Sequence, residues 1–214
     1  MRRKVIDPRI SVAIVVLAAG RSSRMVEGRR HKLLALFDGQ SLVRRSVSTA
    51  LASDCGSVVV VTGHRSTEIA AQVRDLPCEV IHNAEYASGI AGSLRTGVKA
   101  ASKGCPGGIM IMLADMPRLS TGHVDTLIAA FRSGQGRVIA RAVGSGSPGN
   151  PVIFPHDLYN DLQILTGDVG ARSLIEMGNV PVLDVEIGEA ALADVDTAEE
   201  MLAEGGIFDR QFLA

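Results

Sequence analysis

The chain has 214 residues, 46% of them hydrophobic and 21% charged, and its formal net charge is −1. This length and apolar content predict one sizeable core and a single domain over residues 1–214, with residues 1–10 as a loose tail. The near-zero charge excludes a global field that attracts nucleic acid or an anionic membrane, so any anion binding is expected to be local.

The apolar runs and the cysteines set further limits. Each apolar run is about six to eight residues long, far below the roughly 20 needed to span a bilayer. The basic opening MRRKVIDPRI precedes no apolar signal segment, so we expect a cytoplasmic protein. Cys55, Cys78 and Cys105 are far apart and lack metal-ligand spacing, which predicts free thiols.

Seven apolar segments rich in β-branched residues have the length of strands. Most are continuously apolar, which is typical of a sheet covered on both faces. In chain order we predict strands at residues 12–17, 58–62, 79–82, 109–113, 137–142, 151–154 and 182–185.

The first predicted helices lie between these strands. Ser41 is placed to cap a helix with an apolar face that ends at Leu51, and Ser66 to cap the next. Residues 91–102 form a third helix, and Ser120 opens a fourth. Three of the four helices are therefore expected to begin at a serine cap.

Two more helices are predicted near the end of the chain. Asp168 starts a helix that ends near Gly178, and Thr197 and Glu200 have capping-box spacing at the start of the last one. Strands that alternate with helices favour a three-layer α/β fold with right-handed crossovers. In such sheets ligands bind beyond the carboxyl ends of the strands, where the topology switches.

The stretch LAAGRSSRM, residues 17–25, directly follows the first predicted strand. After Leu17, the small residues Ala18, Ala19 and Gly20 let a ligand approach the backbone, whose successive N–H groups can form an anion-binding concavity. The stretch matches neither G-x-G-x-x-G nor G-x-x-x-x-G-K-[ST], which disfavours a nicotinamide-binding module and a P-loop ATPase.

Positive side chains surround this turn. Arg21 and Arg24 add full charges, and Lys32 can reach in as a mobile point charge. A bound polyphosphate explains this cluster, and a surface turn with solvated arginines is the alternative that the residues alone leave open.

LAAGRSSRM followed by HKLL resembles the L-A-A-G-x-x-x-R-M…K-L signature of the MobA-like nucleotidyltransferases, a Rossmann-like group. The similarity continues through VVVVTGH, SGIAGSLRTGV, LADMP, GNPVIF, GDVGAR and DVDT, and it is greatest to the molybdenum cofactor cytidylyltransferases. The resemblance implies a three-layer α/β/α Rossmann-like nucleotidyltransferase fold with a mostly parallel sheet.

Two aspartates occupy positions suited to a metal. Asp115 ends a predicted strand, and Asp196 lies just before the capping Thr197. Mg²⁺ prefers one or two protein carboxylates and fills its other positions with water and phosphate oxygens. The residues alone leave open a turn or cap role for both, and Asp194 is a nearby alternative to Asp196. The resemblance implies that Asp115 and Asp196 hold Mg²⁺.

The nucleotide-binding and acceptor-binding residues follow from the resemblance. It implies that Thr62, Gly63, Gly89 and Ser93 line the nucleotide site together with Leu17, Ala18, Ala19, Gly20 and Arg21. It also implies that Asn150, Pro151, Asp168 and Arg172 face the acceptor. Simple turn and helix-start chemistry is the alternative for these segments. His64 is expected to be an exposed loop residue without a role in proton transfer, and Arg141 is left outside the site.

The reaction implied is transfer of CMP from CTP to the terminal phosphate of a molybdopterin-type pterin, with release of pyrophosphate. Lys32 would contact the α-phosphate and Arg24 the β- and γ-phosphates, and Mg²⁺ would bridge the triphosphate. A molybdenum hydroxylase apo-enzyme is the implied recipient. The alternatives are a guanylyltransferase that uses GTP, a cytidylyltransferase for a sugar or polyol phosphate, and a non-catalytic cofactor carrier.

Overall fold

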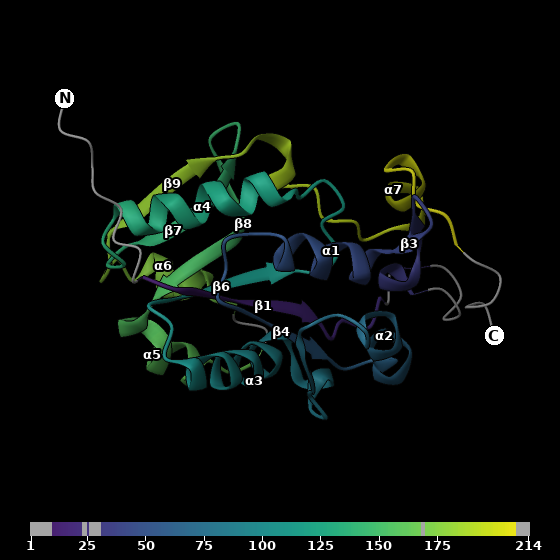
Figure 1. The fold of residues 1–214 in the computed structure, drawn as a ribbon, viewed down its shortest axis with the longest axis horizontal. Helices are drawn as coiled ribbons and strands as arrows, with labels where there is room; N and C mark the ends of the chain where they lie inside the picture. The colour runs from purple at the N-terminus through teal and green to yellow at the C-terminus, as the bar shows by residue number, and fades with distance from the viewer. Residues whose placement is uncertain (1–9, 23–24, 26–30, 168–169, 209–214) are drawn as a thin grey trace.

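The computed structural model describes residues 10–22, 25, 31–167 and 170–208. Its centre is a seven-stranded sheet with the strand order β5-β4-β1-β6-β8-β7-β9 (Figure 1). The strands are β1 (Val12–Ala18), β4 (Ser57–Thr62), β5 (Glu79–His82), β6 (Gly108–Leu113), β7 (Ile139–Gly144), β8 (Ser147–Pro155) and β9 (Val182–Glu186). All seven predicted strands are therefore present, while most of the expected tail at residues 1–10 lies outside the described residues.

The sheet is mostly parallel, as predicted. β1 pairs in parallel with both β4 and β6, and the pairs β4–β5 and β7–β9 are parallel as well. The chain runs outward from β1 through β4 to β5 and then returns to β6 on the other side of β1. The topological switch point therefore lies between the carboxyl ends of β1 and β6, where Leu17 pairs with Leu113.

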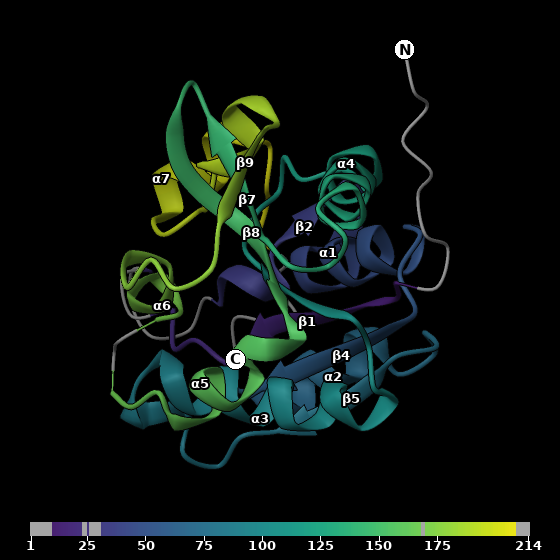
Figure 2. The same ribbon diagram turned by 90° about the vertical axis from the view of Figure 1, so that its left-hand side faces the viewer.

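Helices cover both faces of the sheet and form two outer layers (Figure 2). α1 (Leu42–Leu51), α2 (Ser66–Val73) and α4 (Thr121–Ser133) contribute to one apolar cluster, and α3 (Ile90–Ala101), α5 (Tyr159–Ile164) and α6 (Arg172–Glu176) contribute to the other. Successive residues of β1 alternate between these clusters because side chains along a strand point to opposite faces. The remaining helix, α7 (Ala198–Ala203), packs Met201 into the first cluster.

β7 and β8, between which the sequence predicts no helix, form an antiparallel hairpin. Ser145 and Gly146 make the turn with φ values of 50° and 78°. Positive φ at both central residues suits the two-residue turn that joins twisted antiparallel strands. Pairing with β7 also extends β8 back to Ser147, because it recruits the polar segment that precedes the predicted apolar run.

The helix caps agree with the sequence at two positions and differ at two others. Ser120 caps α4, and Thr197 forms a reciprocal capping box with Glu200 at α7, as predicted. Ser41 is the N-cap of α1, but its hydroxyl makes no cap bond. Ser66 lies inside α2, because the chain enters that helix through a left-handed residue, Arg65.

Several short elements escape the sequence analysis. β2 (Leu36–Phe37) and β3 (Gln40–Ser41) form a small antiparallel pair, and Leu36 exchanges backbone hydrogen bonds with Ile207. The 3₁₀ helices are η1 (Lys32–Leu34), η2 (Tyr86–Ser88), η3 (Ser102–Gly104), η4 (His156–Leu158) and η5 (Gly188–Ala191). Apolar periodicity does not identify elements of two to four residues, because they complete no repeat.

The expected helix start at Asp168 lies outside the described residues. The helix that follows is α6, which ends before Gly178 at φ 71°. The three cysteines are free thiols, as predicted. Within the described residues, none of the helices is both long and apolar enough to cross a membrane.

Gly97 lets α3 pack closely on the sheet. A Cβ atom at this position would lie 2.3 Å from Val15 Cγ1 and 2.9 Å from Val61 Cγ2. The site therefore has no room for even one methyl group.

We expect Gly97→Ala to lower the free energy of unfolding by about 1–3 kcal/mol, because the added methyl group overpacks the contact between α3 and β1. Denaturant unfolding measures this change. Gly104→Ala is the control, since nothing lies within 4 Å of a Cβ at Gly104. Equal stability of the two variants would contradict the packing role of Gly97.

Candidate active site

A cavity of about 480 Å³ lies at the topological switch point. Its walls come from the loop after β1, from η1 and η2, from the start of α3, from the end of β6 and from the loop before α7. Leu17, Ala19, Gly20, Arg21, Lys32, Gly89, Ser93, Asp115 and Asp196 are the predicted site residues that line it. The structure thus brings most of the predicted donor site into one concave surface.

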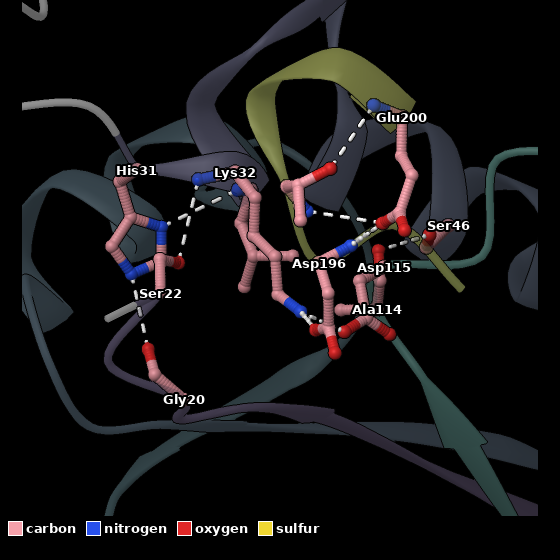
Figure 3. A network of polar contacts seen from close by, with 11 residues as sticks. Gly20, Ser22, His31, Lys32, Ser46, Ala114, Asp115, Asp196 and Glu200 are labelled. Atoms are coloured by element: carbon pink, nitrogen blue, oxygen red, sulfur yellow. Dashed lines mark hydrogen bonds and ion pairs between the residues drawn. The ribbon is translucent and has the colours of Figure 1, made fainter. Parts of the chain in front are cut away.

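Lys32 joins two carboxylates from distant parts of the chain (Figure 3). Its Nζ lies 2.5 Å from Asp115 Oδ2 and 2.8 Å from Asp196 Oδ1. The backbone N–H of Val195 donates to the Asp115 carbonyl at 3.0 Å, which ties the loop before α7 to the end of β6. This backbone bond explains why Asp196 reaches a residue at the end of a central strand.

The environment of Lys32 keeps its ammonium charged. Burial alone would lower the pKa of Lys32, but the charges and hydrogen bonds of Asp115 and Asp196 outweigh it and raise that pKa above its usual value. The second oxygen of Asp115, Oδ1, is buried without a hydrogen-bond partner in the part of the chain that the structure describes. A buried carboxylate oxygen without a partner is a free ligand position for a cation.

Two further bonds hold these acids in place. The hydroxyl of Ser46 in α1 donates to the carbonyl of Ala114 at 2.8 Å, next to Asp115. The carboxylate of Glu200 accepts from the backbone N–H of Asp196 at 2.8 Å.

Asp194, the alternative to Asp196, is exposed and lies outside the cavity wall. Desolvation, followed by the charge of Asp115, raises the pKa of Asp194.

His31, which the sequence analysis did not select, anchors the loop after β1. Its Nε2 lies 3.1 Å from the carbonyl of Gly20, and its Nδ1 accepts from the backbone N–H of Leu33 at 3.3 Å. These partners define a neutral imidazole that carries its proton on Nε2. Burial, followed by the nearby His64, lowers the pKa of His31 to about 4.

His64 is not the exposed loop residue that we expected. Its ring stacks on His31 with the centroids 5.5 Å apart, and its Nδ1 is buried. Tyr86 continues this row of rings beside His64, and the guanidinium of Arg21 lies 5.8 Å from the Tyr86 ring centroid. Contacts of this kind hold an arginine against an aromatic face, so Tyr86 orients a positive charge at the cavity.

Three of the predicted nucleotide-binding residues do not line the cavity. Ala18 belongs to the core cluster on the α1 side of the sheet. The buried hydroxyl of Thr62 donates to the Ile81 carbonyl at 3.3 Å. A Cβ at Gly63 would lie 2.5 Å from Tyr86 Cβ, so Gly63 makes room for η2 and supports the wall from behind. Arg24, the predicted partner of the β- and γ-phosphates, lies outside the described residues.

A second cavity of about 330 Å³ adjoins the first, and the two share Leu17, Ile90 and Leu113. Other apolar residues of its wall include Leu94, Ile111, Val152, Phe154 and Ile175. Of the predicted acceptor residues, Asn150 lines this cavity, Pro151 is buried and does not line it, and Asp168 lies outside the described residues.

The arginines of the second cavity are already paired. Arg172 lines the cavity, but its Nε donates to Glu176 at 2.9 Å on the same helix. Arg141, which the sequence analysis left outside the site, also lines it and makes two hydrogen bonds to Asp184, at 2.8 and 3.0 Å. The first cavity can thus hold a polyphosphate with a cation, and the second presents a largely apolar surface for a second substrate.

Comparison with known proteins gives a family match. Residues 14–184 match the model of the MobA-like NTP transferase domain. The chain is 33% identical to the purine catabolism protein PucB of Bacillus subtilis and 31% identical to the nicotine blue oxidoreductase of Paenarthrobacter nicotinovorans. Each match covers 87% of this chain, with 92% of PucB and 93% of the oxidoreductase.

Two more distant matches extend over similar lengths. The molybdenum cofactor cytidylyltransferase of Escherichia coli is 25% identical over 90% of this chain and 94% of its own. The crystal structure of an rv0371c homolog from Mycobacterium sp. strain JC1 superposes with a TM-score of 0.76 at 27% identity, covering 91% of this chain and 95% of that one. The fold predicted from the sequence is therefore confirmed.

We expect stability to fall as the pH drops from about 6.5 to about 4, because the unfolded chain takes up a proton on His31 in this range and the folded chain does not. The pKa shift corresponds to a loss of stability of about 3 kcal/mol. This loss is complete below pH 4 and does not occur above pH 6.5. Urea unfolding at several pH values, compared between the wild type and His31→Gln, isolates this contribution. The same pH dependence in both proteins would show that His31 is not buried in its neutral form.

Proposed function

The chain belongs to the MobA-like NTP transferase family, and from that premise we propose that it transfers CMP from CTP to the terminal phosphate of a molybdopterin-type pterin and releases pyrophosphate. The observation that carries the proposal is the meeting of Lys32, Asp115 and Asp196 in the cavity below the turn after β1. A molybdenum hydroxylase apo-enzyme would receive the product.

The carboxylates fit a divalent cation. Asp115 and Asp196 supply hard oxygen ligands, and Asp115 Oδ1 is buried without a partner among the described residues. These residues would hold Mg²⁺, which supplies positive charge to the triphosphate as it reacts. The number of carboxylates suits Mg²⁺, because this ion keeps several positions for water and phosphate.

The cationic side chains would stabilise the charge that develops during transfer. The acceptor phosphate is already a nucleophile, so its oxygen attacks the α-phosphorus of CTP as the bond to the β-phosphate oxygen breaks and pyrophosphate leaves. Lys32 would turn from the carboxylates to the α-phosphate, and Arg21 lines the same cavity. Preorganised cations of this kind are the main catalytic device for such a step.

The second cavity favours a planar acceptor. Leu17, Ile90 and Leu113 are shared by both cavities, so a molecule in the second one lies next to the nucleotide. Its largely apolar wall suits the flat faces of a ring system. The E. coli molybdenum cofactor cytidylyltransferase, similar over 90% of the chain, supports a pterin as the acceptor.

An oxidoreductase is the second candidate, because one relative with 31% identity is a nicotine blue oxidoreductase. Two features favour transfer instead. The turn after β1 lacks the glycine pattern of dinucleotide sites, and a hydride transfer has no need of the paired acids at Asp115 and Asp196.

Pyrophosphate release separates these activities. The purified protein is incubated with Mg²⁺ and each nucleoside triphosphate, with and without the pterin phosphate. The proposal expects release from CTP that depends on the pterin. Release from GTP identifies the guanylyltransferase, and release with a sugar phosphate in place of the pterin identifies that cytidylyltransferase. No release with any nucleotide, or oxidation of a nicotinamide cofactor instead, would refute the transfer reaction.

We expect Lys32→Ala and Asp115→Ala each to lower turnover by about 100-fold or more, because each removes a charge that acts on the reacting phosphates. Steady-state pyrophosphate release measures the loss, and circular dichroism checks the fold. Lys103→Ala and Asp157→Ala are the matched controls, since both residues are exposed and lie outside the two cavities. Near-normal turnover in both active-site variants would contradict the roles proposed for Lys32 and Asp115.

We also expect chelation by EDTA to abolish pyrophosphate release and added Mg²⁺ to restore it, because two carboxylates alone repel a triphosphate. Activity that survives exhaustive chelation would rule out the metal.

A further inference from the structure

Asn83 and Ser93 form a buried pair of polar side chains, of which Ser93 lines the uncharged wall of the 480 Å³ cavity. Asn83 follows β5 directly, and Ser93 lies in the first turn of α3. Asn83 is 6% and Ser93 4% exposed, and Asn83 Nδ2 lies 3.0 Å from Ser93 Oγ. Ser93 is one of the predicted nucleotide-binding residues, and Asn83 is not.

The direction of this hydrogen bond is fixed by a third group. The backbone N–H of Glu85 donates to the other end of the Asn83 amide, Oδ1, at 3.0 Å. A backbone N–H can only donate, so the oxygen of the amide must face Glu85 and the NH₂ group must face Ser93. Ser93 Oγ therefore accepts from Asn83, and its proton points elsewhere.

Within the described part of the chain, the one hydrogen bond of the Ser93 hydroxyl is the bond that it accepts from Asn83. Its own proton has no acceptor there. Ser93 lines the 480 Å³ cavity, so a bound ligand is the available acceptor. A nearly buried hydroxyl that keeps its proton without an acceptor carries a free-energy cost that such a ligand removes.

The position of Ser93 assigns this hydroxyl to the nucleoside. The charged groups of the cavity come from the loop after β1, from η1, from the end of β6 and from the loop before α7. The segment from Tyr86 to Ser93 contributes uncharged residues to the wall. A nucleoside triphosphate places its phosphates against the charged groups and leaves the nucleoside for the uncharged segment.

We propose that Asn83 is a positioning residue that holds Ser93 as a hydrogen-bond donor toward N3 of cytosine. The inference rests on the proposed use of CTP and deepens it. Cytosine N3 is an acceptor, whereas N3 of uracil carries a proton and would meet the Ser93 proton donor to donor. Asn83 thus selects the base through the hydroxyl that it orients.

Asn83→Asp reverses the polarity of the pair with little change in shape. An aspartate oxygen still accepts from the Glu85 N–H, but the other oxygen now accepts the proton of Ser93. Ser93 then presents lone pairs to the cavity and favours a donor such as uracil N3–H. The added negative charge weakens every triphosphate alike, so this effect cancels in the ratio of CTP to UTP affinity.

The test is isothermal titration calorimetry of CTP and UTP with Mg²⁺ and without an acceptor. The proteins are the wild type, Asn83→Asp, Ser93→Ala and the double variant. Asn160→Asp is the control, because Asn160 is exposed and lines neither cavity. We expect the wild type to prefer CTP, and Asn83→Asp to lower the CTP-to-UTP affinity ratio by about tenfold or more, with no change in the control.

The double variant tests whether Asn83 changes base preference through the Ser93 hydroxyl or by another route. If Asn83 acts through Ser93, Asn83→Asp changes the ratio only while Ser93 is present, so it has no further effect in the Ser93→Ala background. An unchanged ratio in a folded Asn83→Asp protein that binds CTP overturns this inference and leaves the proposed function standing. A wild type that binds neither CTP nor UTP refutes the proposed function itself, and the inference with it.

Discussion

The ammonium of Lys32 between two carboxylates is the interaction on which the site depends. Its Nζ lies within 2.8 Å of oxygens from Asp115 and Asp196, which belong to segments far apart in sequence. Two carboxylates placed this close repel each other unless a cation lies between them. The backbone bond from Val195 to the Asp115 carbonyl adds a neutral link. Together these contacts join η1, β6 and the loop before α7 around one cavity.

The sheet places this ion cluster beside a second, apolar space. Because the chain leaves β1 on one side and returns on the other, the loops after β1 and β6 diverge and open the first cavity. The hairpin of β7 and β8 then brings Asn150 and Val152 to the neighbouring cavity. Leu17 and Leu113, paired in the sheet, line both. The two cavities thus share a wall built from the two central strands.

Neutral polar groups complete the site where charge would be costly. His31 is buried close to Lys32, and its neutral imidazole holds the Gly20 carbonyl without adding a further positive charge. Asn83 is a second neutral group of this kind: its amide oxygen accepts from the Glu85 N–H, and its NH₂ group donates to Ser93. In both places a neutral side chain donates at one end and accepts at the other, which a charged side chain cannot do.

The sequence by itself determined the strands, the caps at Ser120 and Thr197, and the small-residue turn after β1, because these depend on local periodicity and short-range backbone chemistry. Family resemblance added the site residues, of which the structure gathers most in one cavity. Only the tertiary structure decided that the Thr62 hydroxyl donates to the Ile81 carbonyl, and that the Asn83 amide donates to Ser93. The physical reason is that a side chain's role depends on which distant group satisfies it, and local sequence does not specify that partner.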